Sequence, residues 1–99
     1  MAADLIFAPE AESDISQAYS WYDKQRVGLG EEFLTCLDAC VARICRQPLG
    51  FSMFHENYRR ALVRRFPYAI FFECIDSTIT VYGVFHTARD PQKWRDRLV

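Results

Sequence analysis

The feature that most constrains the fold is an alternating, largely apolar run from Arg59 to His86. Two turn signals divide this run. At Phe66-Pro67 the proline fixes the backbone, and Asp76-Ser77 is a turn-forming pair between segments of high β propensity. The run therefore predicts three short antiparallel strands, with a sheet face that needs a second layer to cover it.

The second turn decides which side chains share a face of this sheet. With a two-residue turn, Phe72 lies opposite Val81, and Tyr68 lies opposite Phe85. Because side chains alternate along a strand, the expected apolar face consists of Tyr68, Ile70, Phe72, Cys74, Ile79, Val81 and Phe85. The expected mixed face, suited to a partner, consists of Ala69, Phe71, Glu73, Thr80, Tyr82, Val84 and His86.

Two amphipathic helices are predicted before these strands. Residues 3–8 predict a short first strand, and Pro9 starts a helix that extends to about Arg26. A Gly-Leu-Gly turn at 28–30 leads into a second helix, from residue 29 or 31 to residue 47. The apolar stripes of this helical hairpin need a sheet, and the predicted apolar face supplies it.

The remaining segments complete one predicted domain over residues 1–99. Residues 48–58 have no strong pattern and are predicted to form a loop, and residues 92–98 a short helix or an irregular tail. The expected order is β-α-α-β-β-β. We therefore predict an α+β fold in which a helical hairpin packs on one face of a small, mainly antiparallel sheet.

The charged residues are unevenly distributed along the chain. The net charge is −1, but residues 1–54 carry −4 and residues 55–99 carry +3. The positive half coincides with the predicted strands and tail. Two explanations stay open: a polyanion or acidic protein segment as partner, and an ordinary solvated surface.

The sequence carries no signature of export, membrane insertion, or cofactor binding. The first residues lack the basic and apolar regions of a signal peptide, and no apolar run approaches the roughly 18 residues that span a bilayer. We therefore expect a cytoplasmic protein without membrane contact. The spacing of the four cysteines matches no zinc pattern, and nucleotide-binding loops are absent, so we expect neither metal nor cofactor.

Arginines flank the predicted strands. Guanidinium groups can chelate phosphate, and strand alternation would send Arg59 and Arg65 to one face and Arg60 and Arg64 to the other. Protection of an edge strand by basic residues is an equally good explanation. A second basic cluster follows the last strand and consists of Arg89, Lys93, Arg95 and Arg97.

Single residues suggest further chemistry. His86, at the end of the last strand and on the same face as Tyr82, is a candidate general acid or base, although a structural histidine is the commoner explanation. Trp94 either stacks on bases or anchors the tail, and Trp21 is a second stacking candidate. The loop residues His55 and Glu56 are not placed by the sequence.

Taken together, a series of short motifs resembles the RelE/ParE toxin superfamily over essentially the whole chain. The motifs are Asp14-Ile15, Trp21-Tyr22, Gly28-Leu29-Gly30, Phe33, Arg59-Arg60, Arg65-Phe66-Pro67-Tyr68-Ala69-Ile70 and the series His86, Arg89, Asp90, Pro91 and Trp94. The resemblance implies a toxin of a bacterial type II toxin–antitoxin module, neutralised by an antitoxin whose C-terminal segment wraps around it.

The resemblance also implies site residues. In the mRNA-cleaving RelE branch, basic residues hold the scissile phosphate, which makes Arg65, Arg89 and His86 the catalytic candidates. The ribonuclease set is incomplete, since Ala61 replaces an expected basic residue and Thr87 replaces an aromatic one. Candidates for nucleic-acid or partner binding are Arg59, Arg60, Arg64, Tyr82, Trp94 and Arg95.

The incomplete set of ribonuclease residues favours the ParE-like branch, whose members poison DNA gyrase by a route less closely tied to catalytic residues. The leading prediction is therefore a ParE-like toxin that inhibits DNA gyrase and binds a cognate antitoxin. The first alternative is a metal-independent endoribonuclease that cleaves mRNA on the ribosome. The second is a non-toxic binding module that serves plasmid maintenance.

Overall fold

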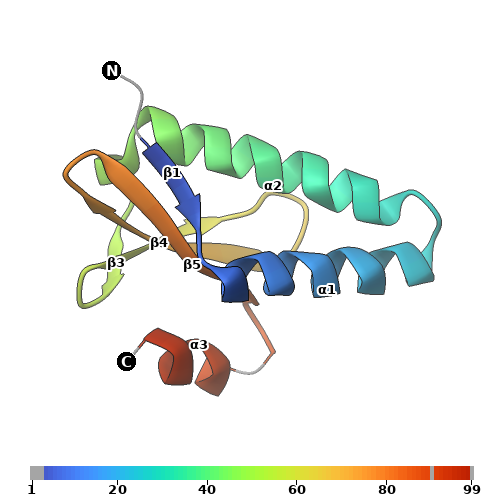
Figure 1. Cartoon of the computed structure of the whole chain (residues 1–99). Coiled ribbons are helices and arrows are strands. Elements are labelled where there is room, and N and C mark those ends of the chain that lie inside the picture. The colour runs from blue at the N-terminus through green and yellow to red at the C-terminus, as the bar shows by residue number, and fades with distance from the viewer. Residues whose placement is uncertain (1–3, 90, 99) are drawn as a thin grey trace.

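A five-stranded mixed sheet separates two helical layers in the computed structural model, which describes residues 4–89 and 91–98 (Figure 1). The strands lie in the order β1-β5-β4-β3-β2, and all neighbours are antiparallel except β1 and β5. Their bounds are β1 (Asp4–Phe7), β2 (Met53–His55), β3 (Tyr58–Leu62), β4 (Tyr68–Ile75) and β5 (Thr78–His86). The predicted α+β fold is confirmed; residue 3 of the predicted first strand lies outside the described residues.

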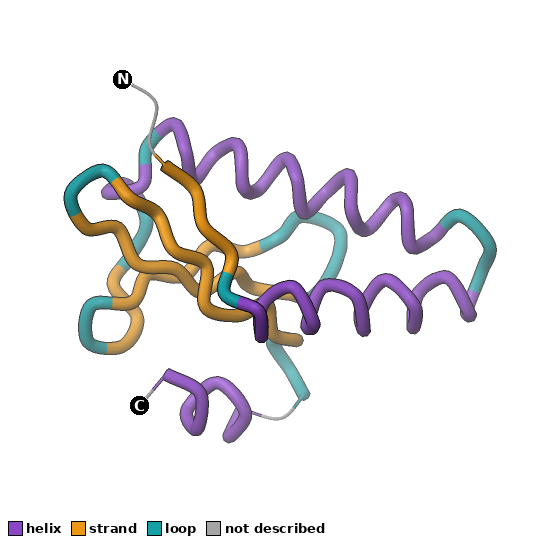
Figure 2. The backbone as a smooth tube through the Cα atoms, in the orientation of Figure 1, coloured by secondary structure: helices purple, strands orange, loops and turns teal. Residues whose placement is uncertain are grey.

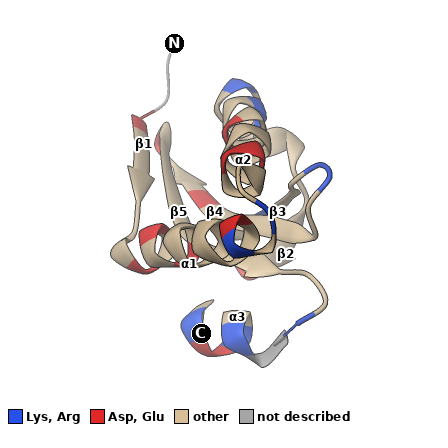
Figure 3. Cartoon of the chain, turned by 90° about the vertical axis from the view of Figure 1, so that its right-hand side faces the viewer, with Lys and Arg blue, Asp and Glu red and all other residues tan. Residues whose placement is uncertain are grey.

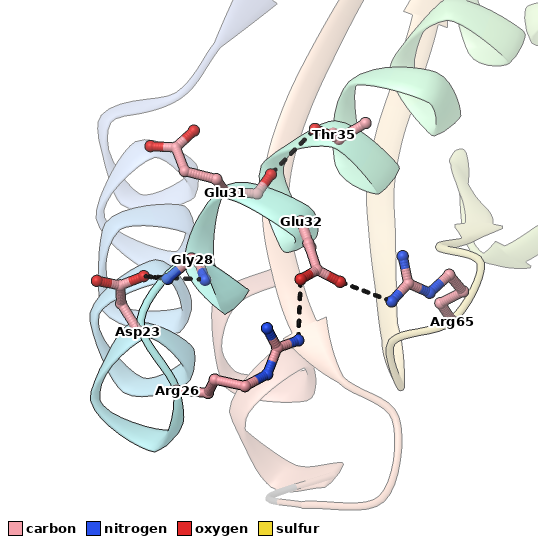
Figure 4. Close-up of polar contacts among 8 residues, drawn as sticks. Asp23, Arg26, Gly28, Glu31, Glu32, Thr35 and Arg65 are labelled. Atoms are coloured by element: carbon pink, nitrogen blue, oxygen red, sulfur yellow. Dashed lines mark hydrogen bonds and ion pairs between the residues drawn. The ribbon is translucent and has the colours of Figure 1, made fainter.

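The helical hairpin covers one face of the sheet (Figures 1 and 2). It consists of α1 (Pro9–Gln25) and α2 (Leu29–Arg46). Between them, one carboxylate oxygen of Asp23 accepts the backbone N–H groups of Gly28 at 3.0 Å and Gly30 at 3.2 Å (Figure 4). Gly28 has a φ of 92°, which favours glycine, so this tight connection depends on the residue at that position.

The hairpin and the sheet enclose the main core. Phe33 and Phe72 are its largest fully buried side chains, and an aromatic cluster forms around Tyr22 at the end where β4 begins. The buried members from the sheet are Ala61, Tyr68, Ile70, Phe72, Ile79, Val81 and Val84, and those from the hairpin are Ala11, Ala18, Tyr22, Phe33, Leu37, Cys40 and Ile44.

A β-bulge changes the predicted faces of β5. Phe72 pairs with Val81 as predicted, but Phe71 pairs with Gly83, so Tyr82 is an extra residue and the register shifts. Ile70 then pairs with Val84, and Tyr68 with His86.

The predicted faces of three residues at the end of β5 are therefore wrong. Val84 and His86 lie on the hairpin side of the sheet, and Phe85 lies on the opposite side.

Two further predictions about the middle of the chain are wrong. Residues 48–58 contain a 3₁₀ helix η1 (Pro48–Gly50) and the edge strand β2, which adds a fifth strand. Arg65 lies in the loop between β3 and β4 rather than on a strand, with a left-handed φ of 72°. Arg59 and Arg60 do alternate, because Arg59 pairs with Phe72 and Arg60 with Phe71.

The C-terminal helix α3 (Pro91–Leu98) packs on the face opposite the hairpin (Figure 1). Its Trp94 ring stacks on Phe71 at 6.0 Å and meets Phe54 edge-on at 4.7 Å. Trp94 thus anchors the tail, as one of the two predictions stated. Among the described residues, none of the helices has both the length and the apolar character that crossing a membrane requires.

Candidate functional site

A pocket of about 200 Å³ lies beside the end of β5, and we call it the α1–β5 pocket. α1 supplies one wall, the first residue of β4 and the last residues of β5 supply the floor, and Arg89 of the loop after β5 and Lys93 of α3 complete the lining. Its lining residues are Asp14, Gln17, Ala18, Trp21, Tyr68, Val84, Phe85, His86, Arg89 and Lys93. Two of the three predicted catalytic residues, His86 and Arg89, therefore share one pocket.

Arg89 is held against the exposed tryptophan of α1. Its guanidinium carbon lies 5.2 Å from the centroid of the Trp21 ring, within the range of a cation–π contact. The Trp21 ring in turn packs edge-on against Tyr22 at 5.1 Å. This stacking orients a positive charge at the rim of the pocket, and the sequence prediction of Trp21 as a stacking residue did not foresee that its partner is within the chain.

His86 uses one ring nitrogen to stabilise the backbone that follows β5. Its Nδ1 accepts the N–H groups of Ala88 and Arg89, both at 3.1 Å, which assigns the proton of the neutral imidazole to Nε2. Burial, and after it the positive charge of Arg89, lowers the pKa of His86 from its ordinary value of 6.5. His86 is thus a neutral imidazole at pH 7 whose Nδ1 is already occupied.

Tyr68 lies on the same side of the sheet as His86, with the two ring centroids 5.3 Å apart. Burial raises the pKa of Tyr68, while the charge of Arg89 acts in the opposite direction. The phenol is therefore neutral and can donate a hydrogen bond at the floor of the pocket.

Asp14 is the pocket residue that the sequence analysis missed. Its carboxylate accepts the backbone N–H of Val84 at 3.1 Å and is bound by both terminal nitrogens of Arg97. Asp14 is the buried charged residue of α1, although a carboxylate near a helix N-terminus usually faces solvent. It was not recognised because its partners follow it by 70 and 83 residues in the sequence.

Arg65, the third predicted catalytic residue, does not line the pocket. Its guanidinium donates to Glu32 of α2 at 2.8 Å, and the same carboxylate binds Arg26 at 2.9 Å (Figure 4). The hydrogen bond from Arg65, followed by the one from Arg26, lowers the pKa of Glu32. Arg65 thus links the loop between β3 and β4 to the tip of the helical hairpin.

The sequence model that describes the ParE toxin of the type II toxin–antitoxin system parDE matches residues 5–91. This span covers the hairpin, all of the sheet except Asp4, and all of the α1–β5 pocket lining except Lys93. The chain belongs to the ParE toxin family. It is therefore a toxin-type member of a type II toxin–antitoxin system, within the RelE/ParE superfamily that the sequence motifs indicated. No curated protein sequence matches the chain.

Solved toxin structures share the fold of this ParE family member. A chain of the chromosomal ParDE system of P. aeruginosa superposes with a TM-score of 0.76 at 12% identity, covering 85% of this chain and 95% of that one. A chain of the RelBE2 toxin–antitoxin complex of Mycobacterium tuberculosis superposes with a TM-score of 0.60 at 16% identity, covering 87% of this chain and 99% of that one. A mutant of E. coli toxin RelE in the free state superposes with a TM-score of 0.66 at 16% identity, covering 99% of this chain and 96% of that one.

The residues predicted to bind a partner lie on two separate surfaces of this ParE family member. On the α3 side, Arg60 stacks on the Phe54 ring at 4.6 Å, and Arg95 on the Trp94 ring at 5.4 Å. Tyr82 donates its hydroxyl to Glu73 at 3.1 Å on the same side.

The other two candidates lie toward α2. Arg59 donates to the carbonyl of Phe51 at 2.6 Å, and Arg64 is exposed in the loop after β3. Neither of these two arginines lines the α1–β5 pocket. Their role in binding stays a prediction, as it does for the four residues on the α3 side.

The two residues that the sequence left unplaced lie at the β2 edge. His55 ends β2 with its ring 5.8 Å from Trp94, and Glu56 follows in the turn with a φ of 50°. Neither lines the α1–β5 pocket. Within residues 4–89 and 91–98, no three His, Cys, Asp or Glu side chains group in a way that would hold a metal ion.

Proposed function

We propose that this ParE family toxin acts in the cytoplasm by binding and inhibiting DNA gyrase, and that a cognate antitoxin neutralises it. The match to the ParE sequence model over residues 5–91 supports this target. The absence of a complete set of nuclease residues among the described side chains supports it too.

The observation that carries the proposal is the arrangement of the three catalytic candidates. A metal-independent ribonuclease needs a base and cationic groups around one phosphate. Arg65 is bound to Glu32 on α2, outside the pocket that contains His86 and Arg89. His86 has its Nδ1 occupied by two backbone N–H groups. These contacts favour a protein-binding toxin over a nuclease.

One observation favours the alternative of a ribosome-dependent mRNA endonuclease. His86 and Arg89 line the same pocket, together with the hydroxyl-bearing Tyr68 and the cationic Lys93. The Nε2–H of His86 and the guanidinium of Arg89 are groups that could donate to a phosphate. This alternative requires Arg65 to leave Glu32 when the substrate binds.

Expression of the chain alone in bacterial cells tests these functions. We expect growth arrest accompanied by gyrase-linked DNA breaks, without new mRNA ends on ribosomes. Codon-dependent mRNA cleavage with intact DNA would instead establish the endonuclease. Normal growth with soluble, folded protein would indicate a non-toxic module for plasmid maintenance.

A further inference from the structure

The strand β1 lies at one edge of the sheet, and no described strand neighbours its outer side. It pairs with β5 alone, and Figure 3 shows it at the margin of the molecule, beyond the other strands. The opposite edge is less regular, because β2 has three residues, a register shift between Met53 and His55, and Trp94 of α3 against the His55 ring. A further strand can therefore pair regularly with β1 but not with β2.

The parallel pairing with β5 decides which backbone groups of β1 face outward. The N–H groups of Asp4 and Ala8 donate to carbonyl oxygens of the turn before β5 and of β5 itself, at 3.0 and 2.9 Å respectively. Because successive residues of a strand direct these groups to opposite sides, Leu5 and Phe7 direct their N–H and C=O groups away from the sheet. These two residues thus offer unpaired donors and acceptors at the spacing that an antiparallel strand requires.

Two apolar side chains of this edge are exposed to solvent. Leu5 is 38% exposed on the hairpin side of the sheet, and Ile6 is 51% exposed on the α3 side. Edge strands are commonly protected by lysine or proline, and residues 4–7 contain neither. Pro9 follows directly after Ala8 and has no N–H group to donate, so it limits regular pairing to this short segment.

We propose that β1 pairs with β1 of a second copy of this chain, in an antiparallel arrangement that does not depend on the target of the toxin. A two-fold axis perpendicular to the sheet keeps each residue on its own face, so one residue of β1 must lie opposite itself. With Ile6 in that place, Leu5 exchanges both backbone hydrogen bonds with Phe7 of the second copy, and every outward-facing group of the strand is paired. With Leu5 or Phe7 in that place, the other of the two would lie opposite a residue outside β1.

The side chains of the two copies also match when Ile6 lies opposite itself. The two Ile6 side chains meet on the α3 side, and Leu5 meets Phe7 of the second copy on the hairpin side, so both faces gain apolar contacts. Asp4 lies opposite Ala8, which is the N-cap residue of α1 and makes no side-chain capping hydrogen bond. The carboxylate of Asp4 therefore approaches the positive end of α1 in the second copy.

The pairing is expected to be weak because the interface is small. Interfaces that bury less than about 1,200 Å² are typical of transient complexes, and a strand of four residues forms an interface of this class. Glu10 and Glu12 in the first turn of each α1 add repulsion between the copies. We therefore expect an equilibrium between one and two chains rather than a permanent dimer.

Sedimentation of the purified chain at increasing concentration tests the association. We expect the mean mass to rise from that of one chain towards that of two between about 1 µM and 1 mM. The mass of a single chain throughout this range would overturn the proposal. Growth beyond two chains would overturn it too, because a pairing that involves a different second edge does not close.

Ile6→Lys and Leu62→Lys are a matched pair of variants for this measurement. Both replace an apolar residue on the α3 side that is about half exposed, 51% and 54%, but Leu62 lies on β3, away from the β1 edge. Ile6→Lys sets two ammonium groups opposite each other, so we expect its dissociation constant to rise about tenfold and that of Leu62→Lys less than about twofold. Circular dichroism confirms folding, and equal shifts in the two variants would refute β1 as the interface.

Oxidative cross-linking of Ile6→Cys and Leu5→Cys tests the register. Directly opposite residues in a non-hydrogen-bonded pair have Cα atoms about 4.5 Å apart, within reach of a disulfide, whereas the two copies of Leu5 would be more than about 7 Å apart. We expect Ile6→Cys to cross-link at least about tenfold faster than Leu5→Cys. The unmodified chain, with its four native cysteines, is the blank. Equal rates would indicate random collision, and a faster Leu5→Cys would place the axis elsewhere, so either result overturns the proposed pairing.

Discussion

The carboxylate of Asp14 on α1 and the guanidinium of Arg97 on α3 form a two-point ion pair, with N–O distances of 2.5 and 3.2 Å. The Asp14 side chain is 5% exposed and that of Arg97 is 22% exposed. The guanidinium of Arg97 also lies 4.7 Å from the centroid of the Phe85 ring. This pair connects the helical hairpin to the C-terminal helix past the end of β5, and it therefore links the two layers that the sheet separates.

Removal of one member of this pair should destabilise the domain strongly. Asp14→Leu leaves Arg97 without its counter-charge and the N–H of Val84 without its acceptor, so we expect a loss of about 3 kcal/mol in the free energy of unfolding. Replacement of both residues, in Asp14→Leu/Arg97→Met, should restore much of that loss, because no buried charge then remains unpaired. Urea unfolding of both variants checks this, and a double variant less stable than the single one would contradict it.

Close packing of the hairpin leads to a prediction at Gly30. A Cβ atom there would lie 2.9 Å from the backbone oxygen of Tyr19 and 2.8 Å from its ring, so the helices would have to separate. Gly30→Ala should cost about 1–3 kcal/mol. At Gly50, the added Cβ would lie 3.6 Å from the nearest atom, and Gly50→Ala should stay within about 0.5 kcal/mol of the original chain. Thermal unfolding of both chains gives the comparison, and similar costs at the two glycines would refute the packing argument.

Phe72 lies at the centre of the main core, and its truncation should lower the free energy of unfolding more than that of any other residue on the sheet. Its side chain is fully buried and packs edge-on against Phe51 at 5.8 Å. Phe72→Ala opens a cavity and should cost about 3–5 kcal/mol. Leu49→Ala, at a largely exposed position, should cost no more than about 0.5 kcal/mol. Chemical denaturation measures both, and a loss below about 1 kcal/mol for Phe72→Ala would contradict its place in the core.

Most of the fold was predictable because periodicity and turn residues agree along the chain. The helices, the Asp76-Ser77 turn and the hairpin-covered face all follow from these local signals. The bulge was not predictable from alternation, since one extra residue in β5 exchanges the faces of every residue beyond it. The signal in the sequence was Gly83, because a glycine inside a strand pattern often marks a bulge. The Cβ that any other residue carries would meet the Phe85 ring at 2.4 Å.

The candidate site was less predictable because its parts are joined through long-range contacts. His86 and Arg89 are close in sequence, and their shared pocket follows from that proximity. The burial of Asp14 depends on Arg97 at the far end of the chain, and the position of Arg65 depends on Glu32 of α2. No local pattern reports either pairing, so the sequence predicted neither the burial of Asp14 nor the position of Arg65 in a loop.

The state of His86 predicts how stability depends on pH. At pH 7.5, well above the ordinary histidine pKa of 6.5, the imidazole is mostly neutral in both the folded and the unfolded chain. The pKa of His86 is lower in the folded chain, so below a pH of about 6.5 the unfolded chain binds the proton more readily and stability falls. We expect His86→Asn, which keeps an acceptor for the following N–H groups, to lose this part of the dependence. Urea midpoints at pH 7.5 and 5.5 test it, and an unchanged difference between them in the variant would remove His86 as the cause.

Arg65 and Arg26 offer a test that distinguishes a nuclease from a protein-binding toxin. Both bind the same carboxylate of Glu32, and their side chains are 61% and 60% exposed. Arg65→Ala and Arg26→Ala should therefore each change stability by less than about 1 kcal/mol. An endonuclease that uses Arg65 and Arg89 loses its toxicity in Arg65→Ala and Arg89→Ala and keeps it in Arg26→Ala. A gyrase-binding toxin that leaves Arg65 paired with Glu32 keeps its toxicity in Arg65→Ala as well, and this is the outcome we expect. Growth assays with circular dichroism of each purified variant decide between them, because a folded but inactive Arg65→Ala chain would favour the endonuclease.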